Sequence, residues 1–184
     1  MIKRIRVYAI LLTCLYCLSS AGAVAAAEFD FSIDVPDGWW RVKSDKYLVI
    51  TRDGAFRHYI LVQARPLALP FKNTGKLMQS THLPNEAARI VMDEISADPN
   101  LTDLQIIENN PATVAGQPGF QLTFLYTDPS GIIFKTIYYG CIHGDRFYNL
   151  RYSASAEDYF GQEAWREFSA VRDSLKIDSP TVFE

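Results

Sequence analysis

The sequence predicts an α+β fold built around a largely antiparallel β-sheet. Several segments alternate apolar and polar residues with the period of a β-strand, and two others repeat apolar residues at helical spacing. Neither an internal repeat nor a linker divides the chain after residue 27. Strands joined by short turns, with few helices, fit one α+β domain.

The first 27 residues have the layout of a secretory signal peptide. Basic residues come first, followed by an apolar stretch over 7–18 and a small-residue stretch over 19–27 with two A-x-A sites. We expect cleavage after Ala27, which leaves a single domain over 28–184 and places it in the periplasm or outside the cell. The alternative is an uncleaved membrane anchor, because residues 7–27 are just long enough to span a bilayer.

Composition excludes several classes of protein. The chain is 48% apolar and 13% aromatic, which is unlike a disordered chain. Loss of the basic signal segment lowers its net charge from −3 to −6. An acidic domain repels phosphate backbones, so we expect no nucleic-acid partner, and no membrane span remains after cleavage.

The first half of the mature chain is predicted to hold three strands. Residues 29–35 alternate apolar and polar positions until Pro36-Asp37-Gly38 ends the strand with a turn. Two further strands, 47–52 and 56–65, flank Asp53-Gly54, a dipeptide typical of hairpins.

A long loop and a helix follow. Pro66–Leu83 has no clear period and is longer than most structureless connections. Pro84 suits the first position of a helix, and an apolar stripe of period four continues until Asp98-Pro99 ends it.

The second half is predicted to hold most of the sheet. A short strand over 104–108 precedes three long strands, at 119–127, 132–142 and 146–154. A final helix after Gly161 carries an apolar stripe from Ala164 to Leu175.

Turn lengths predict which side chains share a face of the three long strands. A loop of two residues (Pro129 and Ser130), or of four from Asp128, joins the first two strands, and a two-residue Gly144-Asp145 turn joins the last two. The predicted apolar face then holds Phe120, Leu122, Phe124, Tyr126, Ile133, Ile137, Tyr139, Tyr148, Leu150 and Tyr152. The opposite face is mixed, with Thr136, Asn149, Arg151 and Ser153, and forms either a thinner core under a helix or an open surface.

Four short patterns stand out along the chain: the segment 33–39 (IDVPDGW), the Arg52-Asp53-Gly54 turn, the segment 114–119 (VAGQPG) and the spacing Phe168-x-x-Val171-x-x-Ser174-Leu175. Together they resemble PsbP-like domains. The resemblance covers about residues 29–177. It implies a three-layer α/β/α sandwich with a central antiparallel sheet and a non-catalytic interaction module, and it carries over no functional residue.

The sequence offers few groups for catalysis. Cys141 is the only cysteine after residue 27, so no internal disulfide forms in the mature monomer. His58, His82 and His143 have no partners at metal-ligand spacing and are interpreted as ordinary surface or turn residues, so we expect no metal and no cofactor.

The sequence therefore predicts an exported, non-catalytic binding domain whose partner is an unknown envelope protein or a small ligand. The candidate binding loop is 66–83, with apolar residues Leu67, Leu69, Phe71, Leu77 and Met78. The alternative interpretation of that loop is that it completes the core. Two other functions stay open: a small hydrolase using Cys141 and His143, and a membrane-anchored structural protein of the envelope.

Overall fold

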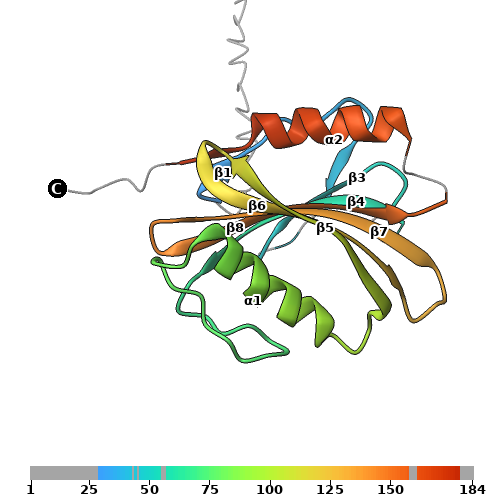
Figure 1. Cartoon of the computed structure of the whole chain (residues 1–184). Helices are drawn as coiled ribbons and strands as arrows, with labels where there is room; N and C mark the ends of the chain where they lie inside the picture. Colours follow the sequence, from blue (N-terminus) through green and yellow to red (C-terminus); the bar gives the residue numbers. More distant parts are fainter. Residues whose placement is uncertain (1–28, 43, 45, 55–56, 158–160, 179–184) are drawn as a thin grey trace, which may run out of the picture.

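A computed structural model describes residues 29–42, 44, 46–54, 57–157 and 161–178 (Figure 1). The predicted signal peptide, residues 1–27, lies outside the described residues.

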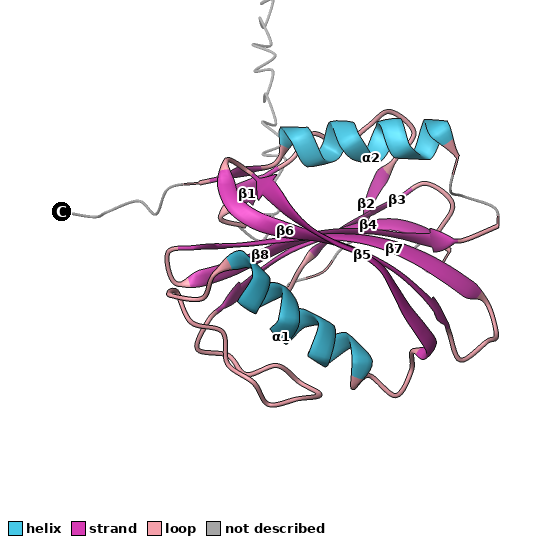
Figure 2. Ribbon diagram, viewed as in Figure 1, coloured by secondary structure: helices cyan, strands magenta, loops and turns pink. Residues whose placement is uncertain are grey.

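Seven strands form one antiparallel sheet in the order β2-β3-β4-β8-β7-β6-β5 (Figure 2). Along the chain these strands are β2 (Trp40–Val42), β3 (Leu48–Thr51), β4 (His58–Pro66), β5 (Thr102–Val114), β6 (Gln117–Thr127), β7 (Ile133–His143) and β8 (Arg146–Ser155). A separate two-stranded sheet pairs β1 (Phe31–Ser32) with β9 (Lys176–Ile177). The predicted α+β class and the largely antiparallel sheet are confirmed.

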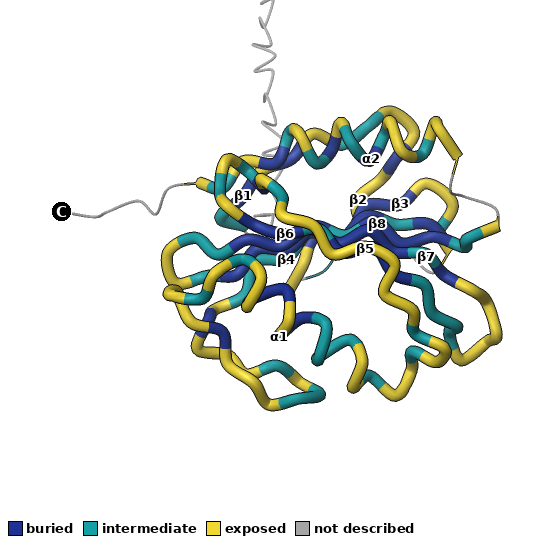
Figure 3. Tube along the Cα trace, viewed as in Figure 1, coloured by how far each residue is buried: buried dark blue, intermediate teal, exposed yellow. Residues whose placement is uncertain are grey.

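One helix lies on each face of the large sheet: α1 (Pro84–Ser96) on one and α2 (Gln162–Ser174) on the other (Figure 1). Both helices are amphipathic, and each packs its apolar stripe on the strands. Val91 of α1 joins a core with Phe120 and Leu122, whereas Phe168 of α2 joins a second core with Leu150. Burial is therefore concentrated along the sheet between two exposed helix surfaces (Figure 3).

The predicted register between β6 and β7 is wrong by one residue. Thr127 pairs with Ile133, so the connecting loop has five residues rather than two or four. Asp128 causes this length, because its backbone N–H donates to the Ile132 carbonyl and its carboxylate accepts the backbone N–H groups of Ser130 and Ile132. Gly131, with a φ of 84°, supplies the left-handed residue that the loop needs.

An odd loop length moves every side chain of one strand to the other face. Phe124 therefore lies opposite Thr136 and shares the α1 face, while Ile137 lies opposite Tyr152 on the α2 face. The apolar set predicted for one face is in fact divided between two cores, except for Ile133, which is half exposed.

The turn between β7 and β8 is as predicted. His143 pairs with Arg146 across Gly144 and Asp145, and Gly144 has a φ of 60° whereas Asp145 has a negative φ, which fits a type II′ turn. This register places Tyr148, Leu150 and Tyr152 on the α2 face. It places Asn149, Arg151 and Ser153 on the face that α1 partly covers.

Two other strands differ in length from their predictions. The strand predicted over 104–108 is longer in the structure: β5 continues through Asn109-Asn110-Pro111, because it is an edge strand and an edge tolerates a proline that lacks a backbone N–H. The first predicted strand, 29–35, keeps only Phe31–Ser32, although Phe31 and Ile33 remain buried and Ser32 and Asp34 exposed.

Candidate functional site

A groove lies on the α1 face of the sheet, where α1 packs mainly on β5, β6 and β7. Its volume is about 630 Å³, and its lining comes from α1, the 66–83 loop and strands β4, β6, β7 and β8. A second hollow of about 460 Å³ adjoins it and shares Tyr59, Tyr126 and Arg151. Ligand sites are concave surfaces of this size with a few convergent polar groups.

The floor of the groove is polar although it belongs to the sheet. Thr136, Asn149 and Ser153 are all buried there, on strands β7 and β8. The Thr136 and Ser153 hydroxyls share a hydrogen bond of 2.7 Å, and the Asn149 amide donates to Gln63 of β4. These polar side chains are buried in the sheet and line the groove.

Arg151 is the unusual member of this floor. It lies on β8 between Leu61 of β4 and Tyr138 of β7. Its Nε is the one buried side-chain nitrogen or oxygen without a hydrogen-bond partner in the part of the chain that the structure describes. Its guanidinium carbon lies 6.0 Å from the centre of the Tyr59 ring.

The walls of the groove are largely apolar. Leu69 and Phe71 of the 66–83 loop form one side, and Val91 and Ile95 of α1 form the other. The loop is held against α1 by Glu94, whose carboxylate accepts hydrogen bonds from the backbone N–H groups of Asn73 and Thr74 at 2.9–3.1 Å.

Basic side chains outnumber acidic ones in the groove. Its cations are Lys46, Arg65, Lys72 and Arg151, and its acids are Glu94 and Asp98. Loop amides already bond both acids, because Asp98 accepts from the backbone and side chain of Asn100. The groove is thus locally basic in an acidic protein.

The structure separates the five apolar residues of the predicted binding loop. Leu67 and Met78 are buried in the α1-side core, and Phe71 packs against it with Arg65 3.8 Å above its ring. Leu69 and Leu77 are more than half exposed. The loop therefore completes the core with three residues and leaves two at the surface, of which Leu69 also lines the groove.

Sequence reasoning did not select the groove floor as a site. The available signal was the mixed face of the long strands, with Thr136, Asn149, Arg151 and Ser153 on one side. The wrong β6–β7 register assigned the apolar β6 side chains to the opposite face. The mixed face was therefore not expected to lie beside an apolar core.

Cys141 is poorly placed to act as a nucleophile. Its side chain is 2% exposed in the α2-side core, and burial raises the pKa of the thiol to about 12. The thiolate is the reactive form of cysteine, so the hydrolase alternative lacks its activated group. His143 ends β7, and no hydrogen bond joins it to Cys141 among the described residues.

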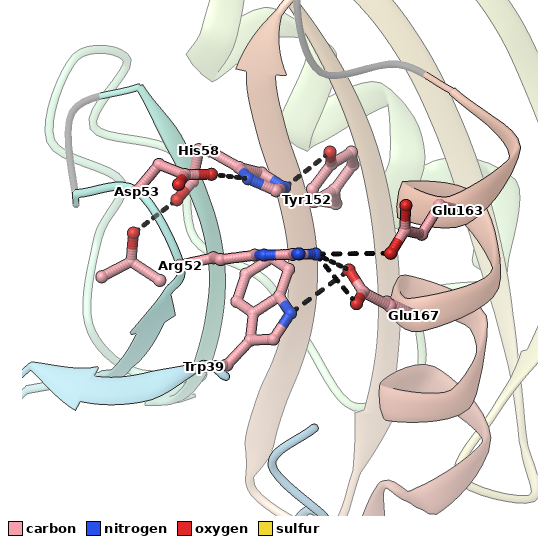
Figure 4. A network of polar contacts seen from close by, with 8 residues as sticks. Trp39, Arg52, Asp53, His58, Tyr152, Glu163 and Glu167 are labelled. Atoms are coloured by element: carbon pink, nitrogen blue, oxygen red, sulfur yellow. Dashed lines mark hydrogen bonds and ion pairs between the residues drawn. The ribbon is translucent and has the colours of Figure 1, made fainter. Parts of the chain in front are cut away.

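His58 is not the surface histidine that the sequence predicts. It is buried at the start of β4, where its ring contacts Asp53 at 3.2 Å through Nδ1 and the Tyr152 hydroxyl at 2.8 Å through Nε2 (Figure 4). Burial lowers its pKa despite the neighbouring Asp53 carboxylate. The order Asp53, His58, Tyr152 resembles a proton relay. Both His58 and Tyr152 are buried, however, so a substrate in solvent cannot contact them.

The same region ties α2 to the β3–β4 hairpin. Glu167 of α2 accepts hydrogen bonds from the Trp39 indole at 3.3 Å and from Arg52 at 3.2 Å, and Arg52 also reaches Glu163 (Figure 4). The Trp39 ring meets His58 edge to face at 4.7 Å. We interpret this network as structural: it fixes α2 to the β3–β4 hairpin, and Trp39 is buried in the α2-side core.

The described residues contain no cluster of three histidine, cysteine or carboxylate side chains placed to hold a metal ion. Within the same residues, no helix is long and apolar enough to cross a membrane.

Solved structures share this arrangement at low sequence identity. Cyanobacterial PsbP (CyanoP) from Synechocystis sp. PCC 6803 matches with a TM-score of 0.54 and 13% identity, covering 87% of this chain and 98% of that one. LpqN of Mycobacterium tuberculosis, a protein involved in cell envelope biogenesis, matches at 0.53 and 18%, covering 81% and 83%. The Ran-binding protein Mog1p of Saccharomyces cerevisiae matches at 0.54 and 10%, covering 84% and 94%.

The fold is PsbP/Mog1-like. A protein of Bacteroides thetaiotaomicron VPI-5482 also matches 84% of this chain with a TM-score of 0.52 and 9% identity, and the chain spans about half (48%) of that protein. No family model and no curated protein sequence matches the chain. At these identities the likeness concerns the fold alone.

Proposed function

We propose that the protein is an exported, non-catalytic binding domain whose small ligand occupies the groove between α1 and the sheet. The observation that carries this proposal is the buried polar floor, where Arg151 keeps an unpartnered Nε under apolar walls. Burying a polar group without a partner costs free energy, so the unpartnered Arg151 Nε beside a hollow favours a role in binding over one in packing.

The same proposal includes the finer assignment of the fold. A helix on each face of the central sheet supports a three-layer α/β/α sandwich, and the likeness to CyanoP supports a divergent PsbP-like domain. The description of LpqN as involved in cell envelope biogenesis accords with export, which here rests on the layout of residues 1–27.

A matched pair of variants tests the groove. N-phenyl-1-naphthylamine, a neutral dye that fluoresces in apolar surroundings, serves as the probe. Ile95→Trp enlarges a side chain that lines the groove, whereas Arg89→Trp places the same ring on the exposed surface of α1. We expect the wild type to bind the dye saturably, Ile95→Trp to weaken binding at least tenfold, and Arg89→Trp to leave it unchanged.

Two results would contradict this proposal. The first is a folded wild-type protein that binds no dye. The second is equal binding by the two tryptophan variants, which would place the dye outside the groove.

A second candidate function is docking of an envelope protein on the 66–83 loop. Leu69, Leu77 and Leu83 of this loop are each more than half exposed, and the similar fold of Mog1p belongs to a Ran-binding protein. Replacing Leu77 with Ser would then reduce recovery of the partner from an envelope extract without lowering the melting temperature.

A further inference from the structure

We propose that the ligand of the groove is a small amphipathic organic anion, whose carboxylate, sulfonate or phosphate group is bound by the Arg151 guanidinium. This inference rests on the proposed function, because it names the ligand class for that same groove. It follows from three independent features: the state of Arg151, the balance of charge around it, and the apolar walls.

Arg151 is held where its charge has no described acidic partner, and the centre of the Tyr59 ring lies 6.0 Å from the guanidinium carbon. In the described chain it makes neither an ion pair nor a hydrogen bond, and its Nε is buried. A guanidinium presents a planar fork of N–H donors that matches the oxygens of a carboxylate or phosphate. An anion in the groove would pair with a guanidinium charge that has no acidic partner among the described residues.

The surrounding charges favour an anion over a cation. Two acids, Glu94 and Asp98, line the groove against four cations, and loop amides already donate hydrogen bonds to both carboxylates. Lys46 and Lys72 are exposed at the groove and add positive potential. Charge of one sign in a low-dielectric hollow concentrates the opposite ion there.

The phenols beside Arg151 do not offset its charge. Burial raises the pKa of Tyr126 and of Tyr138, so both remain neutral hydroxyls at physiological pH. A neutral phenol can donate its O–H, as an anion requires.

The rest of the ligand is expected to be apolar. Leu69 and Phe71 of the loop and Ile95 of α1 line the same hollow as Arg151. An inorganic ion would leave these walls without contact, whereas an organic anion with an aromatic or aliphatic body would cover them. A volume of about 630 Å³ suits a ligand of drug-like size.

Two dyes that differ by one anionic group test the inference. 8-Anilinonaphthalene-1-sulfonate carries the same aromatic frame as N-phenyl-1-naphthylamine plus a sulfonate. Both are titrated by fluorescence against the wild type, Arg151→Met, Arg151→Lys and the control Arg166→Met, which removes an exposed cation from α2 on the opposite side of the sheet. Circular dichroism confirms that each variant is folded before titration.

We expect Arg151→Met to weaken binding of the sulfonate dye about tenfold or more, and to change binding of the neutral dye less than twofold. Arg151→Lys is expected to lie between the two, because lysine keeps the charge but loses the planar fork. Arg166→Met is expected to bind both dyes as the wild type does.

The outcomes separate this inference from the proposal beneath it. If Arg151→Met weakens both dyes equally, or weakens neither, the groove still binds ligands but Arg151 does not select anions, and the inference is wrong. If neither dye binds the folded wild type, the proposed function fails and this inference fails with it.

Discussion

Replacing the adjacent residues Met78 and Leu77 with Ser tests how the 66–83 loop is divided between core and surface. Met78 is 3% exposed and belongs to the α1-side core, whereas Leu77 is 52% exposed. The two positions share backbone neighbours and receive the same new side chain. A difference between the variants therefore reports burial rather than loop flexibility.

The expected magnitudes follow from that burial. Truncation of a buried methionine costs about 2–5 kcal/mol, and Met78→Ser also buries a hydroxyl. For a domain of this size, each kcal/mol lowers the melting temperature by roughly 2–4 °C, which gives a decrease of roughly 4–20 °C. Leu77→Ser changes an exposed side chain and should stay within about 0.5 kcal/mol, or about 2 °C.

Thermal unfolding followed by circular dichroism measures both variants, and urea unfolding supplies the free energies. Equal melting temperatures for Met78→Ser and wild type would refute the assignment of Met78 to the core. A decrease for Leu77→Ser as large as that for Met78→Ser would show that the loop packs as one unit. Phe71 is unsuitable for this test because it both packs on the core and lines the groove.

Four further predictions concern other parts of the molecule. Intact-mass measurement of the exported protein should show Glu28, or failing that Ala26, as the N-terminus, and retained residues before Ala23 would contradict cleavage there. Leu150→Ala leaves a cavity at a fully buried position and should lower the free energy of unfolding, measured by urea titration, by about 2–5 kcal/mol. Cys141 should react with a thiol reagent slowly in the folded protein and rapidly in urea, whereas rapid reaction of the folded protein would restore the hydrolase alternative. His58 has a lowered pKa in the folded state, so the unfolded chain binds a proton first and stability should fall as the pH drops below about 6.5. His58→Gln should remove that part of the pH dependence, and an unchanged slope would assign it to other groups.

The sequence by itself determined the elements whose signals are local. The helix that begins at Pro84, the Gly144-Asp145 turn and the antiparallel class all depend on residues close together in the chain. The alternation after residue 29 correctly predicted that Phe31 and Ile33 are buried. Their strand is short because its partner, β9, comes from the far end of the chain and pairs through only two residues.

Only the tertiary structure decided which face each long strand presents. The loop after Thr127 has an odd number of residues because Asp128 forms hydrogen bonds with the backbone of Ile132, and Gly131 adopts a positive φ. One residue of loop length inverts a whole strand, since side chains alternate with a period of two. The candidate site depends on that inversion, which brings Phe124 and the polar floor of β7 and β8 to one face. Arg151 and the 66–83 loop both line the groove but are far apart in sequence, so no local pattern could have placed them together.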